Sequence, residues 1–161
     1  MYNTALKKGR LNMLFHIIVG FIFPWLLGAY LVKNQTKLFI IFYPIGVATS
    51  ILVNEMGFNY FWKMDIVFQE SSLTGIPYDL GLYPILGCLF IWVIHYKKMP
   101  ILITFLVFTL VTTFGEYILV CLEKIVYRNE WNIIWTGVSY LFAYSIYYVY
   151  YKLVRKFILL N

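Results

Sequence analysis

Residues 101–122 read ILITFLVFTLVTTFGEYILVCL and contain a single charged side chain, Glu116. A run of this length and apolarity matches the ~20 residues that an α-helix needs to cross the hydrocarbon core of a bilayer. Four further apolar runs lie at residues 11–32, 38–58, 78–96 and 131–153. The sequence therefore predicts an all-α fold, an integral membrane bundle of five transmembrane helices.

The overall composition supports a bilayer as the solvent for the whole chain. Of its 161 residues, 62% are hydrophobic and 12% are charged, whereas a soluble domain usually carries about 25% charged residues. Backbone polar groups are costly to leave unpaired in lipid, which favours a helix for each apolar run. We therefore expect residues 1–161 to form one transmembrane helical domain.

The connections between the runs predict which helices are neighbours. Segments 33–37, 97–100 and 123–130 are long enough only for turns. We therefore expect antiparallel packing of the first helix on the second, the third on the fourth, and the fourth on the fifth. Segment 59–77 is longer and carries both charged residues and the apolar residues 66–68, so we interpret it as an element at the membrane interface.

Prolines and tyrosines inside the runs bear on how the helices pack. The prolines each remove a backbone donor and predict kinks, which either adjust packing or free carbonyls that line a cavity. They are Pro24, Pro44 and Pro84. Four tyrosines share one face of the last helix, and this stripe predicts packing, with a groove for an apolar ligand as the alternative. They are Tyr140, Tyr144, Tyr147 and Tyr151.

Five crossings divide the charged residues unequally between the two membrane faces. All seven acids fall on the face that holds the N-terminus, with six basic residues: Glu55, Asp65, Glu70, Asp79, Glu116, Glu123 and Glu130. The opposite face holds seven basic residues and no acid: Lys33, Lys37, Lys97, Lys98, Lys152, Arg155 and Lys156. We expect this basic face to bind anionic lipids of the bilayer, which favours a cytoplasmic C-terminus, while the basic N-terminal flank favours the reverse.

Glu116 lies roughly 9 Å below the predicted end of its helix, inside hydrocarbon, where a carboxylate needs polar partners. The other helices place polar residues near the same depth, so we predict one polar cluster. Its candidate members are Glu116, Asp79, Glu55, Asn54, Asn132, Trp135, Trp131 and His16. We expect hydrogen bonds to Glu116 from Thr112 and Thr113, one turn earlier, and from Asn132 and Trp135 on the next helix.

The function of this cluster is open to several interpretations besides helix packing. The first is a non-catalytic protein that binds a lipid-like or small polar ligand, a partner membrane protein, or a second copy of the chain. The second is a transporter-like module for a proton, ion or small solute. The third is a lipid- or isoprenoid-modifying enzyme that uses Glu116 and Asp79 as acid and base.

Familiar motifs of catalysis and cofactor binding do not occur in the sequence. It contains no HExxH, GxSxG, Walker lysine loop or GxGxxG pattern, so no motif indicates an enzyme, a cofactor or a metal. We also expect no nucleic-acid partner. Cys88 and Cys121 lie at different depths of the predicted bundle, and we predict that they are unpaired.

Three motifs resemble those of a known protein family. They are PYDLGLYPI at residues 77–85, GEY at residues 115–117 and RNEWNIIWT at residues 128–136. Over about residues 16–151 the chain is similar to a family of small multi-spanning membrane proteins of spore-forming Firmicutes. The resemblance implies a bacterial plasma membrane and indicates no activity. Glu130 departs from the pattern, because the family commonly carries glycine before the WN pair.

Overall fold

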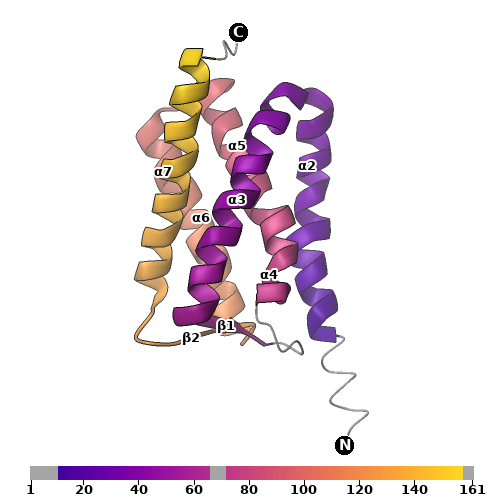
Figure 1. The fold of residues 1–161 in the computed structure, drawn as a ribbon, viewed down its shortest axis with the longest axis vertical. Coiled ribbons are helices and arrows are strands. Elements are labelled where there is room, and N and C mark those ends of the chain that lie inside the picture. Colours follow the sequence, from indigo (N-terminus) through magenta and orange to yellow (C-terminus); the bar gives the residue numbers. More distant parts are fainter. Residues whose placement is uncertain (1–10, 66–71, 158–161) are drawn as a thin grey trace, which may run out of the picture.

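The computed structural model describes residues 11–65 and 72–157, and within them five long helices stand side by side in a bundle (Figure 1). The described chain starts at one end of the bundle, and the last helix ends at the other. The expected interfacial element at residues 66–68, and the acid Glu70, lie outside the described residues.

The helices have the following bounds in chain order. The first, Leu11–Asn34, contains a π-helical turn, η1 (Ile18–Ile22), followed by α2 (Phe23–Asn34). The second is α3 (Thr36–Tyr60). The third combines α4 (Ser72–Pro77), a second π-helical turn η2 (Tyr78–Leu82) and α5 (Tyr83–His95). The last two are α6 (Ile101–Cys121) and α7 (Ile133–Phe157).

Four of the described helices are long and apolar enough to cross a membrane: Leu11–Asn34, Thr36–Tyr60, Leu73–His95 and Ile101–Cys121. The helical, multi-pass membrane character predicted from the sequence is thus confirmed at this level. The third helix begins earlier than the predicted residue 78, because the chain is already helical from Ser72 and Pro77 lies inside the helix. The α7 helix, which is rich in tyrosine, is not among the four.

Two of the prolines lie just after the π-helical turns, with one residue between each turn and its proline. Pro24 comes after η1 and Pro84 comes after η2. Because Pro84 lacks an N–H, the Leu80 carbonyl loses its helical partner. It accepts hydrogen bonds from Trp25 Nε1 at 3.1 Å and from Tyr43 Oη at 2.7 Å. The freed carbonyl is therefore satisfied by side chains of the two neighbouring helices.

Glycines allow the helices to approach closely at two levels. Gly20 of η1 lies so near Gly81 of η2 that a Cβ at Gly81 would overlap the Gly20 carbonyl. Further along the bundle, the Tyr147 side chain of α7 fills the space beside Gly46 of α3 and Gly87 of α5. Tyr144, Tyr147 and Tyr151 are each 4% exposed. The tyrosine stripe therefore faces the core, as the packing interpretation predicts.

A short two-stranded sheet, which the sequence did not predict, lies at the end of the bundle where the described chain starts. Strand β1 (Trp62–Met64) pairs antiparallel with β2 (Ile125–Tyr127), with Lys63 opposite Val126. The sheet links the two segments that were predicted as an interfacial element and as a turn. Trp62, Met64 and Ile125 are buried and form a hydrophobic cluster at this end of the bundle with Phe58, Tyr78 and Leu119.

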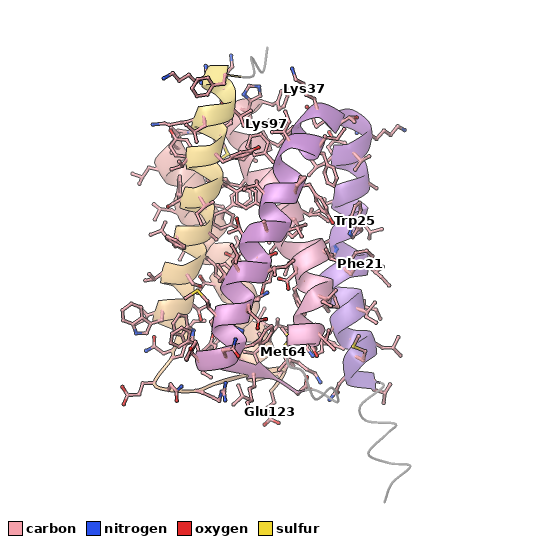
Figure 2. All side chains as sticks on the ribbon, in the orientation of Figure 1. Phe21, Trp25, Lys37, Met64, Lys97 and Glu123 are labelled. Carbon is pink, nitrogen blue, oxygen red and sulfur yellow. The ribbon has the colours of Figure 1, made fainter. Side chains whose placement is uncertain are left out.

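Basic residues lie at the end of the bundle opposite the sheet, and the acid Glu123 lies at the sheet end. Figure 2 shows Lys37 and Lys97 at one end, and Met64 and Glu123 at the other.

The turn before α7 is tightly bent, since Asn129 and Glu130 have φ values of 50° and 61°. This left-handed conformation is uncommon for residues with a Cβ and easiest for glycine.

Candidate functional site

Glu116 lies five residues before the end of α6 and accepts three hydrogen bonds from hydroxyl groups. Its Oε1 accepts from Tyr127 Oη at 2.9 Å and from Thr136 Oγ1 at 3.2 Å. Its Oε2 accepts from Tyr140 Oη at 2.5 Å. The donors come from β2 and α7, so the carboxylate ties three elements together. Hydrogen bonds of this kind can stabilise a negative charge without a cation.

The donors to Glu116 are themselves held in place. Thr136 is 1% exposed and accepts a hydrogen bond from Trp131 Nε1 at 2.9 Å. The Tyr127 hydroxyl lies 2.9 Å from Thr136 Oγ1. Partial burial, and then the nearby Glu116 charge, raise the pKa of Tyr127 well above its ordinary value. Tyr127 therefore keeps the proton that it donates to Glu116.

The donors expected from the sequence make other contacts. Thr112 Oγ1 bonds to the carbonyls of Phe108 and Thr109 in its own helix. The Thr113 hydroxyl is buried and has no hydrogen-bond partner within residues 11–65 and 72–157. Asn132 caps α7 by accepting from the N–H groups of residues 134 and 135. Trp135 is 54% exposed, so neither residue of this pair reaches Glu116.

Asp79 forms a second polar pair, with Asn54. Asp79 is 5% exposed, and its Oδ1 accepts a hydrogen bond from Asn54 Nδ2 at 2.6 Å. Ser50 Oγ bonds to the Asp79 backbone carbonyl at 3.3 Å. Glu55, which the sequence placed in the same cluster, is exposed and bonds to Asn59 on its own helix. The structure therefore joins Asp79 to Asn54 and leaves Glu55 outside.

A small cavity lies between the Glu116 group and α3. Its volume is about 60 Å³, and Asn54 and Ser50 contribute to one wall while Glu116, Ser139 and Tyr140 contribute to the other. Trp62, Met64 and Ile125 lie at the sheet end, and Tyr147 lies further along α7. Asp79 is not among the lining residues. Glu116 is thus the one carboxylate that reaches the cavity from the described chain.

His16 belongs to a third network, close to the sheet. Its ring is 1% exposed, with Nδ1 at 2.9 Å from Tyr78 Oη and Nε2 at 2.9 Å from Asp65 Oδ1. Asp65 also pairs with Lys124 at 2.7 Å, and Lys124 donates to Asn12 Oδ1 at 2.9 Å. The sequence does not predict this network. Asp65 contacts the first helix only because it directly follows β1, whose pairing brings it there. The network ties that helix to the sheet.

The described residues offer no obvious metal site. No group of three or more His, Cys, Asp or Glu side chains lies close enough to hold an ion in residues 11–65 and 72–157. Cys88 is buried, Cys121 is exposed, and both are free, as predicted. The predicted cluster is divided into three hydrogen-bonded groups, centred on Glu116, Asp79 and His16, of which the first two share one cavity through Glu116 and Asn54.

No family model, curated protein or solved structure matches the chain. The resemblance to the Firmicutes family therefore stays a prediction. Taken together, the helices and their composition define a small helical protein with four helices able to span a membrane.

Proposed function

We propose that the chain is a multi-pass plasma-membrane protein with five crossings, and that its cavity binds a small polar ligand beside Glu116. The fifth crossing is α7, whose residues 133–150 carry no charged side chain. It runs beside α6 from one end of the bundle to the other (Figure 1). Its buried tyrosines turn their polar hydroxyls away from lipid. The plasma membrane as the location follows from the family resemblance alone.

The observation that carries this proposal is the position of Glu116 at the cavity wall. A carboxylate offers roughly four acceptor positions, and three of them are used by Tyr127, Thr136 and Tyr140. One acceptor position is thus left for a ligand that donates a hydrogen bond. A volume of about 60 Å³ is far below the ~300–1,000 Å³ of pockets for drug-sized ligands. The ligand is therefore small, such as ammonium or a simple amine.

The cavity disfavours two of the other interpretations. An acyl or isoprenoid chain is too large for about 60 Å³. Acid–base chemistry with two carboxylates needs both near one substrate atom, whereas Asp79 bonds to Asn54 and does not line the cavity. Neither a lipid-like ligand nor a lipid-modifying enzyme gains support from this geometry.

A transporter-like module is the second candidate. The cavity follows α7 from Ser139 to Tyr147, which is roughly 12 Å along a helix axis. It stops short of the far face, because Tyr147 packs beside Gly46 and Gly87. Transport therefore requires the Tyr147 side chain to move, or a second copy of the chain to complete the path.

Glu116→Gln is expected to remove ligand binding while preserving the fold. Glutamine has nearly the same shape, so its oxygen still accepts hydrogen bonds, and its amide can donate to Tyr140. The measurement is the thermal unfolding midpoint of the purified protein in detergent, titrated with methylammonium chloride against sodium chloride. At 100 times its Kd, a ligand stabilises a protein by about 2.7 kcal/mol. We expect a rise for the wild type and none for the variant.

Glu55→Gln is the matched control, because it makes the same chemical change at an exposed acid of α3. It should respond to methylammonium as the wild type does. An equal rise in midpoint for wild type and Glu116→Gln would contradict ligand binding at Glu116. A variant that fails to fold would instead show that Glu116 acts in packing.

A further inference from the structure

A second and much larger space, a groove open to the surface, lies at the end of the bundle opposite the sheet. Its volume is about 630 Å³, which is in the usual range for ligand pockets. It is formed by the turn between α5 and α6 and by the last turns of α7. Four of its lining residues are basic: Lys98, Lys152, Arg155 and Lys156. We call this space the basic pocket.

The beginning of α6 adds a further positive contribution to the basic pocket. Met99, Pro100 and Ile101 line it, and α6 is a helix of 21 residues. The first helical bond of α6 runs from the Thr104 N–H to the Pro100 carbonyl, and no side chain caps the helix. The N–H groups of the first turn are therefore available to an anion, and the helix dipole favours negative charge there.

The turn holds its lysine in an unusual conformation. Lys98 has a φ of 53°, which is uncommon for residues other than glycine, asparagine and aspartate. On the facing helix, Lys152 Nζ lies 5.1 Å from the Tyr148 ring centroid, so this cation is oriented along the pocket wall. Tyr151, also in the wall, bonds to His95 at 3.0 Å. The four basic residues thus come from the turn between α5 and α6 and from the last turns of α7.

Acidic side chains do not neutralise this region within the described chain. Both ion pairs in residues 11–65 and 72–157 involve Asp65, at the sheet end of the bundle. Glu123 also lies at that end, far from Lys97 (Figure 2). A cavity with four basic side chains and a helix N-terminus therefore keeps an excess of positive charge.

We propose that the basic pocket binds a phosphate group. Arg155 matches phosphate oxygens through its planar fork of donors, and the lysines add point charges. The helix N-terminus adds backbone N–H donors of the kind that hold phosphate in many proteins. The phosphate comes from a lipid headgroup or from a soluble phosphate compound, since the pocket lies at the membrane surface in the proposed topology. This site is distinct from the Glu116 cavity and does not depend on its ligand.

The test measures binding to the purified full-length protein by isothermal titration calorimetry in detergent. The probes are dihexanoyl phosphatidic acid, pyrophosphate, and dihexanoylglycerol, which lacks the phosphate. We expect Lys98→Gln/Arg155→Gln to weaken binding of the phosphate probes at least tenfold. Arg155→Lys keeps the charge but loses the fork, so it should weaken binding less. Lys63→Glu lowers the net charge by the same two units at the sheet end of the bundle and should change binding less than twofold.

The probes also distinguish the sources of phosphate. Binding of phosphatidic acid alone indicates a lipid headgroup, and binding of pyrophosphate indicates a soluble phosphate compound; either result supports the pocket. The proposal is overturned if neither phosphate probe binds, if dihexanoylglycerol binds equally well, or if Lys63→Glu weakens binding as much as Lys98→Gln/Arg155→Gln does. The methylammonium response of each variant reports separately on the Glu116 cavity.

Discussion

Gly81→Ala is expected to cause a severe loss of folded protein. A Cβ at Gly81 would overlap the Gly20 carbonyl and lie 2.7 Å from the Phe21 Cα. Both neighbours are backbone atoms, so a side-chain rotation cannot relieve the overlap, and the two π-helical turns must separate. Overpacking usually costs about 1–3 kcal/mol and occasionally more, and we expect a value at or above the top of that range. The measurement is the folded yield and unfolding midpoint in detergent.

Gly115→Ala is the control for this prediction. Nothing lies within 4 Å of a Cβ at Gly115, and alanine is a better helix former than glycine by about 1 kcal/mol. We expect unchanged or slightly raised stability. If Gly81→Ala and Gly115→Ala unfold at the same temperature, the close crossing of η1 and η2 is wrong.

Asn54→Ala is expected to produce the second large effect. Asn54 donates to the Asp79 carboxylate at 2.6 Å, and Asp79 is 5% exposed. Asn54 is neutral, so its removal breaks a hydrogen bond to a buried carboxylate and leaves that carboxylate without its partner, at a cost of about 1.5–3 kcal/mol. Adding Asp79→Asn should recover part of this loss, because a neutral amide is less costly to bury than a charge. The measurement is a double-mutant cycle, in which unfolding midpoints are compared for the wild type, the two single variants and the double variant.

Asn59→Ala serves as the comparison for that cycle. Asn59 is exposed and bonds to Glu55, so its loss should change the free energy of unfolding by less than about 0.5 kcal/mol. Strictly additive effects of Asn54→Ala and Asp79→Asn would mean that the two side chains do not interact in the folded protein.

The helices could be predicted from the sequence because apolarity over about 20 residues is a local property. The start of the third helix could not, because Pro77 also fits the first turn of a helix. The pairing of β1 with β2 was missed for a different reason. Each strand has three residues, which is too short for a periodic pattern, and the pairing joins segments more than 60 positions apart.

The need of Glu116 for polar partners could also be predicted, but the partners could not. Tyr140 was recognised as part of the α7 stripe, yet its contact with Glu116 depends on how α7 is rotated against α6. Tyr127 reaches the carboxylate because β2 folds back on the bundle. Asn132 was expected to be a donor to Glu116, but α7 begins at Ile133, which makes Asn132 its cap instead.

The number of membrane crossings determines on which membrane face each of the two proposed sites lies. With five crossings, the sheet and the Glu116 cavity lie towards one membrane face, and the basic pocket lies at the other. The four helices that are apolar enough to span a membrane would by themselves return the chain to the side where it started. Because α6 alone places Lys98 and Glu123 on opposite faces, the crossing of α7 decides whether its own basic residues reach the face that holds Lys98 and complete the basic pocket.

Cysteine labelling in intact cells tests this topology most directly. In a chain without Cys88 and Cys121, both replaced by alanine, single cysteines are placed by Lys63→Cys, Glu123→Cys or Lys156→Cys. Each variant is treated with a membrane-impermeant maleimide before and after lysis. Five crossings predict that positions 63 and 123 react alike and that position 156 shows the opposite pattern. Reaction of positions 123 and 156 from the same side would contradict a transmembrane α7.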